Sequence, residues 1–257
     1  MNTHPSAIAG VLVAWLAIVP TAIAAEVSVI ASNAVRDALS ELVPVFERES
    51  GHKVTVVWGG TIDIARRVAS GEVFDLVIIP ASWIDDLIEQ RRLRVEGRRD
   101  FVRSAIGVAT RLGVAMPDIS SGGAIKESLL AARSIVLSSG PSAFYLVELF
   151  ERMGITDAIR PKVKQLPPGR SVGEALANGD GDIGFTQVSE FITVKGIVYL
   201  GPLSDDVQHM TVFSMGVHIA AATPEAAHSL GRFLTSPAAV PAIRHSGMEP
   251  VLDAPSK

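Results

Sequence analysis

The sequence has no cysteine and few aromatic residues, and its basic residues do not outnumber its acidic ones. The lack of cysteine excludes thiol catalysis, iron–sulfur clusters, thiolate zinc sites and a lipidated cysteine anchor. Phe, Trp and Tyr make up 5% of the 257 residues, and 23 Lys and Arg stand against 27 Asp and Glu. Because no basic surplus is available to neutralise phosphates, we expect no nucleic acid partner.

Charge is absent from the first 25 residues, which contain no Lys, Arg, Asp or Glu. Within them, Ile8 to Val19 form an apolar run that ends before Pro20 and the small-x-small triplet Ala22-Ile23-Ala24, the form that signal peptidase reads. The run is shorter than the ~20 apolar residues of a transmembrane helix. We therefore predict that residues 1–25 are a signal peptide and that the mature protein is soluble in the periplasm. The alternative is an uncleaved N-terminal anchor.

The remaining chain has the composition of a folded protein. Hydrophobic residues make up 48% of the sequence, and its mean hydropathy of +0.34 excludes a disordered or low-complexity chain. Its length fits one large domain or two modest ones, and it can bury a core without a metal or disulfide.

Several enzyme signatures are also missing. The sequence contains no Walker loop and no His-Glu-x-x-His. The six histidines never have metal-ligand spacing. We predict no catalytic residue, no metal and no cofactor, although a Ser-His-Asp site assembled from distant segments stays open.

Strand and helix patterns alternate along the chain. Strand patterns lie at 26–30, 53–58, 75–80, 101–110, 135–139, 163–166, 182–187, 197–200 and 212–221. Helix patterns lie between them, including one from Val35 to the stop at Gly51, which we expect Pro44 to kink or split. This alternation predicts an α/β protein with mostly parallel sheets.

Four segments join a strand end to small or polar residues before a predicted helix. They are residues 31–34, 59–61, 138–143 and 185–187. A helix N-terminus carries free N–H groups and partial positive charge, so several converging ends form an anion site that needs no Lys or Arg. The alternative is that each Ser or Thr caps only its own helix.

Two stretches carry a resemblance to a known family. They are VSVIASNAVRDALSELVPVFERESGHKVTVVWGGTIDIARRVASGEVFDLVIIPASWIDDL (27–87) and GEALANGDGDIGFTQVSEF (173–191). The first resembles the opening of the periplasmic molybdate-binding proteins of ABC importers, and more widely of the type II periplasmic binding proteins. The second resembles that family's turn and strand leading to the ligand. The resemblance covers nearly all of residues 26–250.

The resemblance implies a fold and a function. The expected fold is a two-lobed α/β type II periplasmic binding-protein fold, each lobe a mostly parallel sheet flanked by helices, with two crossovers between lobes. Lobe one would comprise residues 26–105 and 207–257, and lobe two residues 106–206. The expected function is capture of a small anion in the interlobe cleft for the permease subunits of an ABC importer. We expect a monomer that is not an enzyme.

The resemblance also assigns site residues. The ligand-binding set it implies is Ser32, Asn33, Gly60, Thr61, Ser142, Ala143 and Gln187. Molybdate binders usually have a tyrosine near the position of Gln187, so the ligand is either a molybdate-like oxyanion or a small organic anion. We expect Gln187 to select among anions.

Single residues bear on other functions. Arg170 could pair with a ligand carboxylate, although a surface position is preferred. Ferric-ion binding is disfavoured because Tyr145 and Tyr199 are the only tyrosines and lie far apart. A sensory input domain of the same fold and a periplasmic hydrolase with a dispersed Ser-His-Asp site are the two alternative functions.

Overall fold

The structure is a computed structural model that describes residues 24–252. The predicted signal peptide, except Ala24 and Ala25, lies outside the described residues. No helix between residues 24 and 252 is long and apolar enough to cross a membrane.

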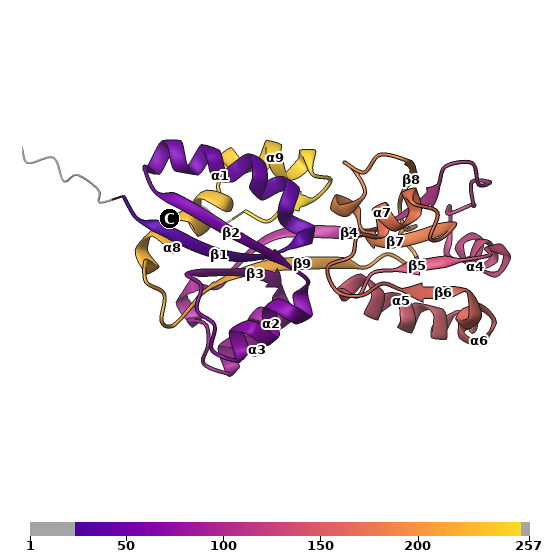
Figure 1. Ribbon diagram of the computed structural model, residues 1–257, viewed down its shortest axis with the longest axis horizontal. Coiled ribbons are helices and arrows are strands. Elements are labelled where there is room, and N and C mark those ends of the chain that lie inside the picture. The colour runs from indigo at the N-terminus through magenta and orange to yellow at the C-terminus, as the bar shows by residue number, and fades with distance from the viewer. Residues whose placement is uncertain (1–23, 253–257) are drawn as a thin grey trace, which may run out of the picture.

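The strands and helices alternate through most of the described chain (Figure 1). The strands are β1 (Glu26–Ser32), β2 (Lys53–Gly59), β3 (Leu76–Pro80), β4 (Arg99–Arg111), β5 (Ile135–Leu137), β6 (Val163–Gln165), β7 (Ile183–Gln187), β8 (Ile197–Pro202), β9 (Met210–Val217) and β10 (Glu249–Pro250). The α-helices are α1 (Arg36–Ser50), α2 (Thr61–Ala69), α3 (Ala81–Glu89), α4 (Gly122–Ala131), α5 (Pro141–Arg152), α6 (Thr156–Ile159), α7 (Val172–Ala177), α8 (Pro224–Leu234) and α9 (Val240–His245). Short 3-10 turns are η1 (Asn33–Val35), η2 (Val95–Gly97), η3 (Arg160–Lys162), η4 (Val188–Glu190) and η5 (Pro237–Ala239).

The strands form one sheet in the order β2-β1-β3-β9-β4-β7-β5-β6, with β8 and β10 also paired to β4. We call β1, β2 and β3 with their covering helices the first half, and β5, β6, β7 and β8 with theirs the second half. Figure 1 shows the two halves side by side, with β4 and β9 running between them.

Each half is covered by helices on both faces because its strand residues alternate in direction. In the first half, Val29 and Ala31 pack under α1, α8 and α9, whereas Ile30 packs against α2 and α3. In the second half, Ile135 and Leu137 pack beneath α4, α5 and α6, whereas Val136 faces α7. Fully covered strands of this kind read as continuous apolar runs, as 76–80 (LVIIP) does.

The prediction of mostly parallel pairing needs correction in the centre of the sheet. The outer strands β1, β2 and β3 pair in parallel, and so do β5, β6 and β7. The long strand β4 pairs antiparallel with β9, β7, β8 and β10. The physical reason is the crossing itself: the chain leaves the first half on β4 and returns on β9, so the two strands run side by side in opposite directions.

The β4 partners change at the middle of the strand. Up to Ala105 it pairs with β9 and β10, and from Ile106 with β7 and β8. Gln208, just before β9, holds both backbone groups of Ile106: its Oε1 accepts from the Ile106 N–H at 2.9 Å, and its Nε2 donates to the Ile106 carbonyl at 3.1 Å. The change of partners falls at the boundary of the predicted lobes, and the division into lobes itself stays a prediction.

Of the predicted kink or split at Pro44, the split does not occur. Helix α1 runs unbroken from Arg36 to Ser50 with Pro44 inside it. A proline removes one backbone donor from a helix. Here the buried side chains Leu39, Leu42 and Phe46 anchor the helix to the core on both sides of Pro44, which offsets that loss.

Candidate functional site

Strand pairing brings the predicted loops together at one edge of the sheet. In the first half, Ser32 at the end of β1 lies opposite Gly59 at the end of β2. In the second half, Leu137 at the end of β5 lies opposite Phe185 of β7, so the segments following both strands leave the sheet at the same level. Ligands of α/β proteins bind in this position, beyond the carboxyl ends of the strands.

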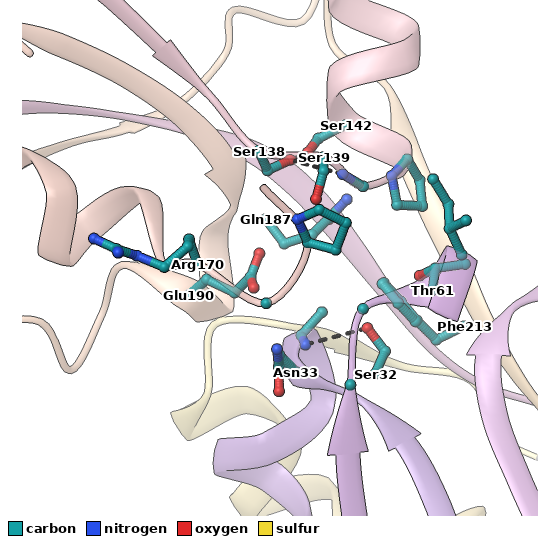
Figure 2. A pocket seen from close by; sticks show the side chains of 18 residues that line it. Ser32, Asn33, Thr61, Ser138, Ser139, Ser142, Arg170, Gln187, Glu190 and Phe213 are labelled. Carbon is teal, nitrogen blue, oxygen red and sulfur yellow. Dashed lines mark hydrogen bonds between the residues drawn. The ribbon is translucent and has the colours of Figure 1, made fainter. Parts of the chain in front are cut away.

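The loops of both halves line one cavity (Figure 2). The lining residues are Ser32, Asn33, Ala34, Gly59, Gly60, Thr61, Ile62, Ser138, Ser139, Gly140, Pro141, Ser142, Pro168, Gly169, Arg170, Gln187, Glu190 and Phe213. The space open to the centres of water-sized molecules is about 50 Å³. One water needs roughly 10–15 Å³ by the same measure, so a small anion or small organic acid fits.

The first-half wall consists of the β1 and β2 ends. The Ser32 side chain is buried, and its Oγ accepts from the Ala34 N–H at 3.3 Å. Thr61 is the first residue of α2, with Gly60 as the cap residue, and its side chain makes no hydrogen bond within residues 24–252. The Thr61 hydroxyl and the first N–H groups of α2 are therefore available to a ligand.

Asn33 lies in the same wall, in the 3-10 turn η1. Its Oδ1 accepts from Arg36 Nη2 at 2.7 Å, and the Arg36 guanidinium in turn stacks over Trp58 at 4.8 Å. The amide oxygen of Asn33 is thus engaged, which leaves the amide N–H groups as donors.

The second-half wall is the start of α5. Gly140 is the cap residue, Pro141 is the first residue of the helix, and Ser142 follows, buried. The hydroxyls of Ser138 and Ser142 share a hydrogen bond of 3.0 Å. Ala143 does not line the cavity: it packs in the second-half core and its N–H donates to the Gly140 carbonyl at 2.9 Å.

Gln187 ends β7 on the floor of the cavity and is 2% exposed. Its Nε2 donates to Thr211 Oγ1 at 3.0 Å, whereas its buried Oε1 has no hydrogen-bond partner in the described chain. No α-helix follows this loop, contrary to the sequence prediction, because the chain makes only the three-residue turn η4. A buried acceptor without a donor is unfavourable, so a ligand that supplies a donor gains affinity here.

Glu190, the last residue of η4, is an acidic group in the cavity wall. The Thr186 hydroxyl donates to Glu190 Oε2, and the backbone N–H of Gln187 hydrogen-bonds the same carboxyl. Burial raises the pKa of the Glu190 carboxyl above its ordinary value, against the lowering effect of these two hydrogen bonds. In Figure 2, Glu190 and Thr61 lie on opposite sides of the cavity.

Arg170 lines the mouth of the cavity from the loop before α7. It is exposed, and Figure 2 shows its guanidinium pointing away from the serines, in line with the preferred surface position. Gly60 faces the same loop: a Cβ there would lie 3.8 Å from the Gly169 backbone nitrogen. The two halves therefore approach one another closely across the cavity.

Two other motifs do not form sites in the described part of the chain. No histidine lines the cavity, so the hydrolase alternative has no imidazole base there. Residues 179–184 have Gly-x-Gly-x-x-Gly spacing, but they lead into β7 instead of following a strand into a helix. That arrangement is not the dinucleotide-binding one.

The chain is similar to known proteins in sequence and in fold. Residues 27–249 match the family described as bacterial extracellular solute-binding protein. The aconitate isomerase of a Pseudomonas species is 32% identical over 230 residues, which is 87% of this chain and 87% of the relative. The molybdate-binding protein ModA of Escherichia coli (strain K12) is 21% identical over 200 residues, 75% of this chain and 77% of the relative.

Among solved structures, the periplasmic molybdate-binding protein of Azotobacter vinelandii matches with a TM-score of 0.73 at 16% identity, covering 89% of this chain and 100% of that chain. The predicted resemblance and fold class are confirmed by these matches.

Proposed function

The chain belongs to the bacterial extracellular solute-binding proteins, and we propose that it captures a small anion in this cavity and presents it to the permease of an ABC importer. The observation that carries the proposal is the convergence of hydroxyls and two helix N-termini from both halves on one cavity, with no lysine among the described lining residues. Such a site binds negative charge through hydrogen bonds and helix dipoles. Ser32, Asn33, Gly60, Thr61 and Ser142 would hold the anion, and Gln187 would select among anions.

For the ligand class, we propose a small organic carboxylate ahead of a tetrahedral oxyanion. Glu190 would repel a compact, fully ionised oxyanion, whereas an organic acid can direct its carboxylates to the helix ends and its carbon skeleton to Glu190. The name of the Pseudomonas relative supports the same choice. Calorimetry with cis- and trans-aconitate, citrate, molybdate, tungstate, sulfate and phosphate decides between the two classes.

Thr61→Ala should weaken binding of the tightest anion in this panel by about ten- to a hundredfold. The variant removes a donor to a charged acceptor, worth about 1.5–3 kcal/mol. Its free energy of unfolding should hardly change, because the hydroxyl makes no hydrogen bond within the described chain. Calorimetry and urea unfolding measure the two effects.

The matched control for this variant is Ser121→Ala. Ser121 caps α4 by accepting from the Ala124 N–H at 3.1 Å, and it does not line the cavity. It should lose about 1 kcal/mol of stability and no affinity. If Thr61→Ala and the parent protein bind with equal affinity, the start of α2 is not part of the binding site.

Closure of the two predicted lobes on the ligand is part of the same proposal. Residues 26–105 with 207–257 and residues 106–206 would move about β4 and β9 near Ile106, where Gln208 joins the two crossovers. The protein would act as a monomer in the periplasm after removal of residues 1–25. Small-angle scattering with and without ligand tests closure, and an unchanged radius of gyration at saturation would contradict it.

A second candidate function is isomerisation of the bound carboxylate. The specific observation in its favour is a carboxyl group, Glu190, inside an anion-binding cavity, and the Pseudomonas relative carries the name of an isomerase. Incubation with cis-aconitate followed by chromatography of cis and trans isomers distinguishes binding alone from turnover.

A further inference from the structure

We propose that Glu190 is a catalytic acid–base residue that moves a proton between two carbon atoms of an unsaturated carboxylate bound in the cavity. The inference rests on the carboxylate ligand proposed above and deepens the second candidate function.

The first support is the placement of the carboxyl group. Glu190 is the acidic residue among the described cavity-lining residues, on the opposite side from the α2 helix end. Two hydrogen bonds, from the Thr186 hydroxyl and the Gln187 N–H, fix its orientation. An acid–base group must be held within reach of the carbon that it deprotonates, and a carboxyl anchored in the wall meets that requirement.

The second support is that this carboxyl works against anion binding unless it has another role. A site evolved only to hold a compact anion gains nothing from a carboxylate in its wall, because like charges repel. A carboxylate base is useful if it faces the carbon skeleton while the ligand's own carboxylates face the helix ends. This arrangement uses both the Glu190 carboxyl group and the anion-binding helix ends. Thr186, which hydrogen-bonds Glu190 but does not itself line the cavity, would be a positioning residue.

The surroundings of Glu190 favour basicity. Burial raises the pKa of its carboxyl, and a base with a pKa nearer the working pH removes a carbon-bound proton more readily. The charged groups that share the hollow behind it are Arg36 and Asp37 of α1, and Arg170 and Glu174 beside and on α7. Two positive and two negative groups leave no large net field to cancel the effect of burial.

The chemical step is a proton shift that needs no other reactant. The Glu190 carboxylate takes a proton from the CH2 group that lies between a carboxylate and a C=C bond. The electron pair of the broken C–H bond forms a new C=C bond, and the pair of the old one shifts onto the far carbon and its carboxylate. The protonated Glu190 exchanges its proton with solvent and delivers a proton to that far carbon, which gives the isomer and restores the carboxylate.

The opposite wall would stabilise the charge that develops. During the shift, negative charge grows on the carboxylate oxygens of the ligand. These oxygens would face the N–H groups at the starts of α2 and α5 and the hydroxyls of Thr61 and Ser142. Fixed donors directed at developing charge lower the barrier of such steps.

The test uses trans-aconitate in D2O. Proton NMR measures deuterium incorporation and isomerisation, and calorimetry measures binding on the same samples. The parent protein should exchange the CH2 protons, and the rate should rise with pH through a pKa above the ordinary 4.5 of a glutamate, because the carboxylate is the active form. Glu190→Gln should slow exchange by at least about a hundredfold and change the dissociation constant by less than about tenfold.

The control variant is Glu174→Gln, an exposed glutamate of α7 in the neighbouring hollow, which should leave exchange and binding unchanged. Glu190→Asp keeps a carboxyl group and should retain measurable exchange, so it carries the test if Glu190→Gln fails to fold. Exchange by Glu190→Gln at the parent rate would overturn the inference. Binding of trans-aconitate without exchange by the parent would overturn it and leave the binding function intact, whereas no binding of any carboxylate would overturn the proposed ligand class as well.

Discussion

Asp75→Ala should lower the free energy of unfolding by about 3–5 kcal/mol, which is a large part of the stability of a typical domain. Asp75, 3% exposed, precedes β3 and joins three segments. Its carboxylate accepts from the Ser28 N–H at 2.8 Å, the Ser28 hydroxyl at 2.7 Å and the Thr223 N–H at 2.8 Å. Alanine leaves these donors without an acceptor, at about 1–3 kcal/mol each.

The stability that the Asp75 carboxylate contributes should depend on pH. Burial raises the pKa of the Asp75 carboxyl, but the hydrogen bonds from Thr223 and Ser28 outweigh it and hold the pKa below the ordinary 3.8. A carboxyl with a lowered folded-state pKa stabilises the protein above its unfolded pKa, and this contribution disappears as the pH falls through the folded value. The stability gap between the parent and Asp75→Asn should therefore narrow below about pH 4.

Urea unfolding at pH 7 and pH 3 measures both effects. The control is Asp86→Ala, an exposed acid on α3, which should change stability by less than about 0.5 kcal/mol. If Asp75→Ala unfolds within 1 kcal/mol of the parent, the three segments are held by packing and not by this carboxylate.

The outer strands could be predicted from the sequence because their apolar runs are typical of strands. The segments that became β1, β2 and β3 lie within about two residues of their predicted bounds. The antiparallel pairing of β4 and β9 could not be read in the same way, because the direction of a crossover depends on where distant segments meet. Pro237 and Pro241 interrupt the sequence pattern of helix α9, although proline is tolerated in a first helical turn.

The cavity residues also divide into those that the sequence predicts and those that it does not. Six predicted residues line one cavity, and the register of β1 and β2 accounts for four of them: Ser32, Asn33, Gly60 and Thr61. A Ser or Thr after a strand signals such a strand end. Glu190 gave no signal, since a glutamate three residues past a strand has no periodic or motif context. Its position depends on the turn η4, which brings it back to Thr186. Ala143, the third residue of α5, does not line the cavity, and its N–H already donates to the Gly140 carbonyl.

Ser142→Asp should weaken binding of the tightest anion in the panel by at least about a thousandfold. The side chain of Ser142 is 1% exposed and lines the cavity at the second residue of α5. Two like charges about 4 Å apart repel by roughly 4 kcal/mol at an effective dielectric constant of about 20, which corresponds to about three decades of affinity. An acid in the first turn of a helix is favourable by about 0.3–1 kcal/mol at exposed positions, which offsets part of the cost of burying this charge.

Ser142→Asn separates charge from size. Asparagine has the same shape as aspartate without its charge, so it bears the same crowding beside Ser138 and should bind the anion at least about a hundredfold more tightly than Ser142→Asp. Calorimetry on the parent and both variants gives the three dissociation constants, and thermal unfolding shows whether both variants are folded. Equal affinity of Ser142→Asp and Ser142→Asn would mean that the negative charge of the ligand does not lie at the start of α5. The anion would then be held by the first-half wall alone, with Ser32 and Thr61 as its hydroxyl donors.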